Sequence, residues 1–182
     1  MEVKKYEYKD VPAISSKDLA YINLEKFLSD YYAYKPDIPS FKKAISDRTD
    51  KPVNRSILVD QLTKDYKAVS PSDLQKSNIE SLSSIDTFTI TTAHQPSLLG
   101  GPLYYVLKIC SVINLCKQLK TEYPEYHFVP TFISGGEDHD FDEVDHLHLY
   151  TKTVRWNRSS RGSVGRLDLE GLDNVLHEVA SI

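Results

Sequence analysis

The feature that most constrains the fold of this chain is a strand, a loop, a buried helix and a second strand in direct succession. Residues 87–92 are rich in β-branched side chains and alternate in polarity, which predicts a strand. Residues 103–120 are apolar around most of the helical circumference, which is typical of a helix that lies on a sheet. Residues 127–134 predict a second strand, although Pro130 removes one ladder donor. This order favours an α/β fold with two parallel strands and a right-handed crossover.

The segments on either side complete the predicted organisation. Residues 1–84 predict a helical N-terminal segment that packs on the core, and residues 85–182 contain the core itself. Ser15 is the predicted N-cap of a first helix, with Asp18 three residues on, and the apolar spacing carries this helix through Tyr31. The other elements predicted are helices over 41–47 and 58–69, a helix that begins at Ser70-Pro71, and a third strand over 147–156.

Composition and charge exclude several classes of protein. The 182 residues are 40% hydrophobic and 26% charged, which suits one globular domain with a sizeable core rather than a fibrous or disordered chain. The net charge of −4 disfavours a generic nucleic-acid binder, because such proteins are usually basic. No segment is apolar for long enough to span a bilayer, and the N-terminus lacks the apolar core of a signal peptide. We therefore expect a cytoplasmic protein without nucleic-acid or membrane partners.

The two cysteines, Cys110 and Cys116, fall on different faces of the helix predicted over 103–120. Their separation along the helix axis is too large for a disulfide. We interpret both as core residues, and the lack of a disulfide framework suits a reducing compartment.

Two unusual loops follow the first two predicted strands, and ligands of parallel sheets bind beyond the carboxyl ends of the strands. In the first loop, His94 and Gln95 precede the helix start Gly100-Gly101-Pro102. The free N–H groups and the dipole of that start would make an anion site, although a plain glycine turn is nearly as good an interpretation. Lys108 either turns back toward this loop or extends to solvent, and the second is favoured. Neither GxGxxG nor GxxxxGK[ST] occurs, so no dinucleotide or P-loop site is predicted.

In the second loop, Gly135-Gly136 lead into four ionisable residues, Glu137–Asp140. Crowded carboxylates raise each other's pKa, and His139 would offset this, so acid/base work or cation binding is predicted. An acidic helix start stabilised by the dipole is the alternative. His146 and His148 could bind a divalent ion together with Asp138, His139 or Asp142, but without HExxH or CxxC the pattern is weak and no metal site is predicted.

These residues also carry a resemblance to a known family. The two motifs are His94-Gln95-Pro96…Gly101-Pro102-Leu103-Tyr104…Lys108 and Pro130…Gly136-Glu137-Asp138-His139-Asp140-Phe141-Asp142-Glu143-Val144…His146. At this separation they resemble the BshC family, the cysteine ligases of bacillithiol biosynthesis. The resemblance covers about residues 87–150, and His94 stands where many members have glutamine.

The resemblance implies a fold, a reaction and a set of site residues. The fold is a Rossmann-like α/β domain, of which this chain would hold the helical lead-in and the first half of the parallel sheet. The reaction adds L-cysteine to glucosaminyl-malate through an amide bond, in the last step of bacillithiol biosynthesis. The implied acid/base residues are Glu137, Asp138, His139 and Asp140. The implied substrate-binding residues are His94, Gln95, Gly100, Gly101, Pro102, Tyr104, Lys108 and His146.

Members of that family are much longer than this chain and dimerise through a C-terminal coiled coil that is absent here. We therefore expect an N-terminal fragment, inactive by itself and with an unpaired sheet edge. Amide formation needs an activated carboxylate, so ATP is the expected source of activation, although the sequence has no ATP signature. Two alternatives stay open. One is a metal-dependent hydrolase or nucleotidylyl transferase that uses Glu137–Asp140, and the other is a truncated, non-catalytic binding module.

Overall fold

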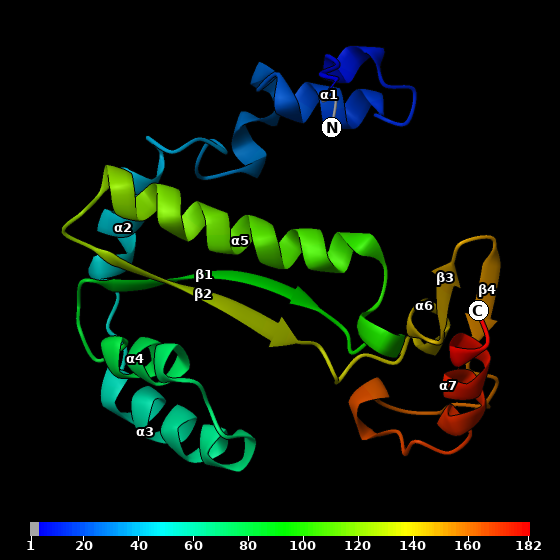
Figure 1. Ribbon diagram of the computed structural model, residues 1–182. Coiled ribbons are helices and arrows are strands. Elements are labelled where there is room, and N and C mark those ends of the chain that lie inside the picture. The colour runs from blue at the N-terminus through cyan, green and yellow to red at the C-terminus, as the bar shows by residue number, and fades with distance from the viewer. Residues whose placement is uncertain (1–3) are drawn as a thin grey trace. The chain divides into compact units, whose positions relative to one another are not determined.

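The structure of the protein is a computed structural model that describes residues 4–182 (Figure 1). The chain divides into two compact units, of which the first ends at Val53 and the second spans Asn54–Ile182. The sequence pattern changes at Asp86, which lies inside the second unit. The helices between residues 54 and 84 belong to the same compact unit as the parallel strands.

The first unit is built from short helices with well-defined ends. These are the 3₁₀ helix η1 (Tyr8–Asp10), α1 (Ser16–Ile22), the 3₁₀ helix η2 (Lys26–Tyr31) and α2 (Phe41–Thr49). The predicted capping box is confirmed, because the Asp18 N–H donates to Ser15 Oγ and the Asp18 carboxylate accepts from the Ser15 N–H. The prediction that this helix runs on past Leu24 is wrong. Leu24 has a φ of 55°, and the Glu25 N–H donates to the Ala20 carbonyl at 2.9 Å, which is how a Schellman motif ends a helix.

In the second unit, a helical pair precedes the strands. It consists of α3 (Arg55–Tyr66), the 3₁₀ helix η3 (Lys67–Val69) and α4 (Asp73–Ser81). The N-cap of α4 is Ser72, in a capping box with Gln75, and not Ser70, whose φ of 51° lies outside the helical region. Arg55 Nη1 donates to the carbonyls of Leu82 and Thr87 at 2.9 and 3.1 Å. The start of α3 is thereby tied to the start of the first strand.

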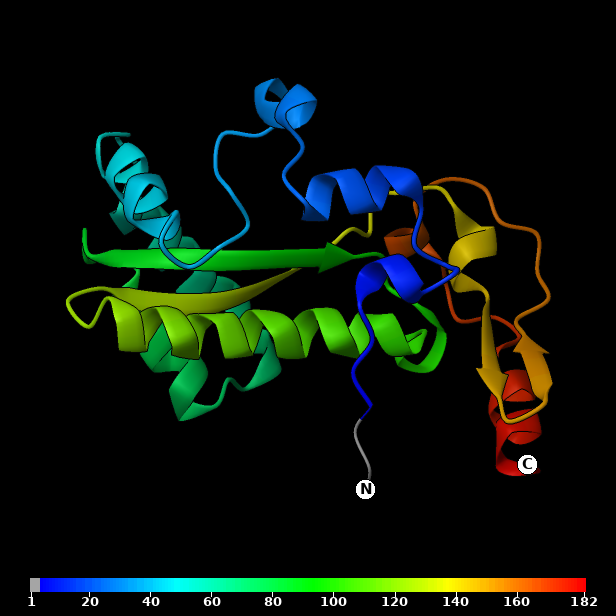
Figure 2. The ribbon, with the colours of Figure 1, turned by 90° about the horizontal axis from the view of Figure 1, so that it is seen from above.

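The predicted strand–helix–strand unit is confirmed. It comprises β1 (Thr87–His94), the 3₁₀ turn η4 (Leu98–Gly100), α5 (Leu103–Glu122) and β2 (His127–Ser134). The strands are parallel, with a register that runs from Thr87 opposite His127 to His94 opposite Ser134. The helix α5 lies along the strand pair (Figure 2) and buries Cys116 and Leu119 against it. Because the two strands end in register, the loops that follow them begin side by side.

A large part of the apolar surface of α5 is exposed. Leu103 is 74% exposed, and Val106 and Leu107 are 51% and 55% exposed. The prediction that both cysteines are core residues is wrong for Cys110, which is exposed, whereas Cys116 is buried. Within residues 4–182 the parallel sheet consists of two strands, so it covers only part of the apolar surface of α5, whereas parallel sheets are normally covered on both faces.

The third predicted strand is wrong, because residues 146–155 fold back on themselves. They form an antiparallel hairpin of β3 (His146–Leu149) and β4 (Lys152–Arg155), separate from the β1–β2 pair. A two-residue turn joins the strands, and Tyr150 within it has a φ of 52°. The positive φ matches the reversed turns that the twist of a hairpin prefers. No glycine or asparagine marks this turn in the sequence, so alternation alone suggested one continuous strand.

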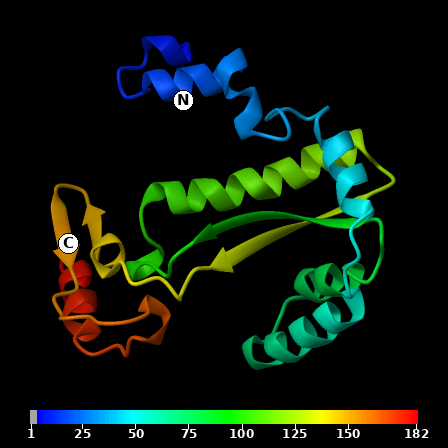
Figure 3. The same cartoon turned by 180° about the vertical axis from the view of Figure 1, so that it is seen from behind.

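The hairpin belongs to a second small core (Figure 3). Its other elements are the short helix α6 (Phe141–Val144), the 3₁₀ turn η5 (Val164–Arg166) and α7 (Leu172–Ala180). Val154 is completely buried there, and the ring of Trp156 lies edge-on to that of Phe141 at 5.6 Å. Leu98, from the loop after β1, packs into the same core, which joins it to the end of the parallel strands. Within residues 4–182, no helix combines the length and apolarity needed to cross a membrane.

Candidate active site

An open cleft of about 290 Å³ lies where β1 and β2 end. The two loops that the sequence predicts to meet there do so. The residues that line the cleft are Ala93, His94, Gln95, Lys108, Gly135, Glu137, Asp138 and Glu143. Both strand ends, α5 and α6 thus contribute side chains of opposite charge to one volume.

On the β1 side, His94 and Lys108 are held by Tyr104. The Tyr104 hydroxyl lies 2.8 Å from His94 Nε2, and the two rings stack with their centroids 5.3 Å apart. Lys108 Nζ lies 5.4 Å from the centre of the Tyr104 ring and donates to the Ala93 carbonyl at 3.3 Å. The favoured prediction, that Lys108 extends to solvent, is therefore wrong, because the amine turns back to the end of β1.

On the β2 side, Asp138 is the most constrained carboxylate. The side chain of Gln95 donates to it, and the N–H groups of His139 and Asp140 donate to Oδ1 at 2.6 and 3.2 Å. These hydrogen bonds hold the pKa of Asp138 below its ordinary value, because they stabilise the ionised form. The one from Gln95 has the largest effect. His139 adds to this lowering, which is the offset that the sequence predicts against the crowding of carboxylates. Gln95 is 7% exposed, and its Oε1 has no hydrogen-bond partner within the described chain.

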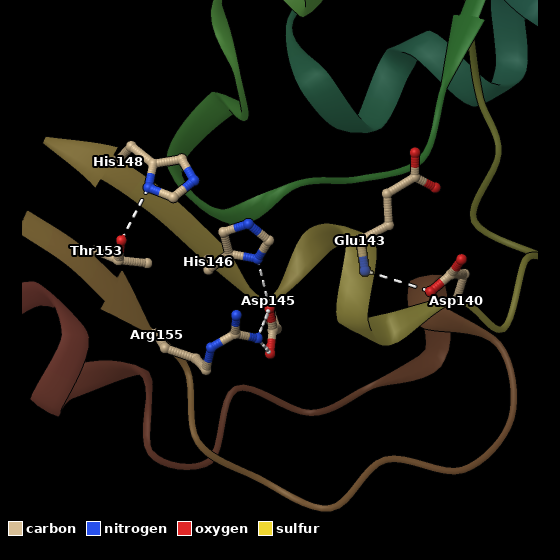
Figure 4. Close-up of polar contacts among 7 residues, drawn as sticks. All are labelled: Asp140, Glu143, Asp145, His146, His148, Thr153 and Arg155. Atoms are coloured by element: carbon tan, nitrogen blue, oxygen red, sulfur yellow. Dashed lines mark hydrogen bonds and ion pairs between the residues drawn. The ribbon is translucent and has the colours of Figure 1, made fainter.

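The rest of the acidic loop divides into lining and supporting residues. Glu137 lines the cleft, whereas Asp140 accepts the Glu143 N–H at 3.3 Å and is the N-cap of α6. His139 and Asp140 do not line the cleft, but their N–H groups donate to the carboxylate of Asp138, which does. Glu143 lines it but was missed as a site residue, because its place in a first helical turn favoured the dipole interpretation. Figure 4 shows its side chain extending away from the α6 cap.

The predicted anion site at Gly100-Gly101-Pro102 lies outside the cleft lining. Gly101 has a φ of 71°, and a Cβ there would lie 2.8 Å from Ser97 Cβ. Loop packing therefore explains this glycine without a ligand. Pro102 is the N-cap of α5, and an anion site at this helix start stays a prediction.

His146 also lies outside the cleft lining, in a polar cluster on the β3–β4 hairpin (Figure 4). Its Nδ1 is 2.7 Å from Oδ1 of Asp145, which also accepts from Arg155 Nη1 at 2.7 Å. The rings of His146 and His148 are 5.2 Å apart, and His148 Nδ1 lies 2.9 Å from the Thr153 hydroxyl. Across residues 4–182, the structure groups no three His, Cys, Asp or Glu side chains in a way that could hold a metal ion.

Comparisons with known proteins identify the family. Residues 1–182 match the family model described as "Bacillithiol biosynthesis BshC, N-terminal Rossmann-like domain". The chain belongs to the BshC family. The BshC relatives it matches are each named "Putative cysteine ligase BshC". That of Flavobacterium psychrophilum is 45% identical over 85% of this chain and 30% of its own length. That of Cytophaga hutchinsonii is 37% identical over 99% of this chain and 34% of its own length.

A relative from Bacillus cereus is 30% identical over 87% of this chain and 31% of its own length. The chain thus spans about a third of the length of the BshC relatives it matches. The Rossmann-like domain and the fragment inferred from the motifs agree with these matches. The family takes part in bacillithiol biosynthesis, and the names of its members point to a ligase.

The geometry of the cleft limits what each group can do. A carboxylate whose pKa is held low, such as Asp138, is a good partner for an ammonium or hydroxyl group and a poor proton acceptor. Glu137 and Glu143 also line the cleft and are exposed, so water can reach them. Lys108 and His94 face them from the β1 side and suit an anionic group.

Proposed function

We propose that the complete protein joins L-cysteine to glucosaminyl-malate through an amide bond, the last step of bacillithiol biosynthesis. This chain would supply the cleft at the ends of β1 and β2. The observation that carries the proposal is that residues of both family motifs line one cleft. Asp138, whose carboxylate accepts from the N–H groups of His139 and Asp140, lies there together with the side-chain amine of Lys108.

The roles follow from the chemistry of amide formation. The attacking amine nitrogen forms a bond to an activated carboxyl carbon, loses a proton, and the leaving group departs with its electron pair. Asp138 would orient the amine through a hydrogen bond, and Glu137 or Glu143 would take the proton, since neither is held by the Gln95 amide. Lys108 and His94 would bind the negative charge of a carboxylate or leaving group.

Activation of the carboxyl group is the step for which the cleft offers no group of its own. ATP is the expected source, and the assay below tests it directly. We also propose that the complete protein is cytoplasmic and forms a homodimer through a C-terminal coiled coil beyond this chain. Size-exclusion chromatography with light scattering would report the dimer.

The test is turnover by the complete protein with L-cysteine and glucosaminyl-malate, with and without ATP, followed by mass spectrometry of the thiol product. We expect product with the wild type and a loss of about 100-fold or more in kcat for Asp138→Asn, since a misplaced amine costs that order of rate. Asp142→Asn is the matched control, because it removes the same charge from the same acidic segment but does not line the cleft.

The outcomes separate the alternatives. Product that depends on Asp138 and not on Asp142 supports the ligase. Binding of glucosaminyl-malate without product under any condition would contradict it and favour a binding module. Hydrolysis of substrate without thiol product, removed by a chelator, would favour the metal-dependent alternative.

A further inference from the structure

A second segment, distant in sequence, holds the backbone of the acidic loop. We call residues 163–166 the strap. The Gly165 N–H donates to the Gly136 carbonyl, and the Val164 N–H donates to the Asp138 carbonyl, each at 2.7 Å. The strap therefore bonds the main chain on both sides of Glu137, next to the side chains that line the cleft.

This contact is so close that it depends on two glycines. A Cβ added at Gly165 would lie 2.9 Å from both Cα and O of Gly136, and one added at Gly136 would lie 3.2 Å from Gly165 Cα. Neither glycine has a positive φ, so backbone conformation does not demand glycine here. The close approach of the strap to the acidic loop is what requires glycine at these positions. An alanine at residue 165 would force the strap and the loop apart.

The strap has little freedom to yield, because its neighbours are anchored. Val164 is 8% exposed and belongs to the second core with Trp156 and Val175, and Leu167 packs against that core. The Leu167 N–H donates to the Val164 carbonyl at 3.2 Å and closes the turn. When a side chain is added at residue 165, the acidic loop is therefore the part that moves.

Movement of the loop would change the site directly. Asp138 is held at its carbonyl by the strap and at its carboxylate by Gln95 and two N–H groups. We propose that Gly165 is a positioning residue, which lets the strap hold Glu137 and Asp138 where the cleft needs them. Its effect on catalysis rests on the ligase function proposed above, whereas its effect on the loop does not.

The first test compares Gly165→Ala with Gly162→Ala in the complete protein. Gly162 has a φ of 88° and nothing within 4 Å of an added Cβ, so its alanine variant strains the backbone beside the strap without touching the loop. We expect kcat to fall about 10- to 100-fold in Gly165→Ala, since small misplacements of reacting groups cost that much. We expect kcat within about twofold of wild type in Gly162→Ala, even where its melting temperature falls.

The second test needs no turnover. In ¹⁵N spectra, the amides of His139 and Asp140 report the titration of Asp138, because both donate to its carboxylate. We expect Gly165→Ala to shift these resonances and raise the midpoint of their acid titration, and Gly162→Ala to leave both unchanged. If Gly165→Ala does not fold, Gly136→Ala probes the same contact at 3.2 Å, and the same shifts are expected in smaller measure.

The outcomes are distinct. A Gly165→Ala variant that is less stable but keeps the wild-type amide shifts and kcat would overturn the proposal, because the contact would then be merely structural. Wild-type protein that forms no product, with the amide shifts moved in Gly165→Ala, would refute the ligase function and leave the strap standing.

Discussion

The ion pair between Asp145 and Arg155 offers a sharp test of how the second core is held. Asp145 ends α6 and is 4% exposed. Both of its carboxylate oxygens accept from Arg155 Nη1, and Oδ1 also contacts His146 Nδ1 (Figure 4). Replacing Arg155 by methionine keeps an unbranched, largely apolar side chain and removes the guanidinium partner of Asp145. The buried carboxylate would then keep only its contact with the ring of His146.

The size of the effect follows from burial. Breaking a fully buried ion pair from one side costs about 3–5 kcal/mol. The Arg155 side chain is 45% exposed, so water already screens part of the attraction and can reach the carboxylate after the substitution. A loss of roughly 2 kcal/mol in the free energy of unfolding is therefore expected for Arg155→Met. For a unit of this size, that lowers the melting temperature by roughly 4–12 °C.

The assay is urea and thermal unfolding of a four-variant cycle. Asp145→Asn in the Arg155→Met background should recover part of the loss, because no buried charge is left without a partner. Asp168→Asn is the control, since that carboxylate pairs with Arg158 at 2.7 Å but is 70% exposed, and it should lower the stability much less than Arg155→Met does. Equal losses for Arg155→Met and Asp168→Asn, or strictly additive losses around the cycle, would refute the reasoning.

Three further predictions test other parts of the structure. Burial raises the pKa of the Cys116 thiol to about 11, so iodoacetamide at pH 8 should label the exposed Cys110 in the native protein and leave Cys116 until it unfolds, as read by peptide mass. Leu119→Ala should cost about 3 kcal/mol in urea unfolding, because Leu119 of α5 is completely buried against the strand pair; a loss below about 1 kcal/mol would contradict this packing. Gln95→Leu should raise the pKa of Asp138 toward its ordinary value in a ¹³C carboxyl titration. Because the folded pKa is lowered, the stability that Gln95 lends is present above the ordinary pKa of the carboxyl group and is lost as the pH falls through the folded pKa, so wild type and variant should converge in acid.

Local sequence pattern predicts those parts of the fold in which the type of each residue follows from its burial or exposure within its own helix or strand. The β-branched run over 87–92 and the apolar residues of 103–120 predict β1 and α5, because a strand and a helix that pack on each other need such side chains. The Ser15 capping box is equally local. Local pattern fails where the chain turns without a turn residue. Leu24 and Tyr150 take positive φ values that their side chains do not favour, because the end of α1 and the two-residue turn between β3 and β4 require them.

The candidate site divides in the same way. The sequence by itself determined that His94, Gln95 and Glu137–Asp140 follow two parallel strands, and topology then requires that they meet at one sheet edge. Three things were decided by the tertiary structure alone. They are which of these residues line the cleft, the lowering of the pKa of Asp138 by hydrogen bonds, and the close approach of Gly165 to Gly136. The physical reason is the sequence distance over which each interaction acts. Periodicity reflects the burial of a residue within its own helix or strand, whereas a hydrogen bond between segments distant in the chain does not change the local pattern of either segment.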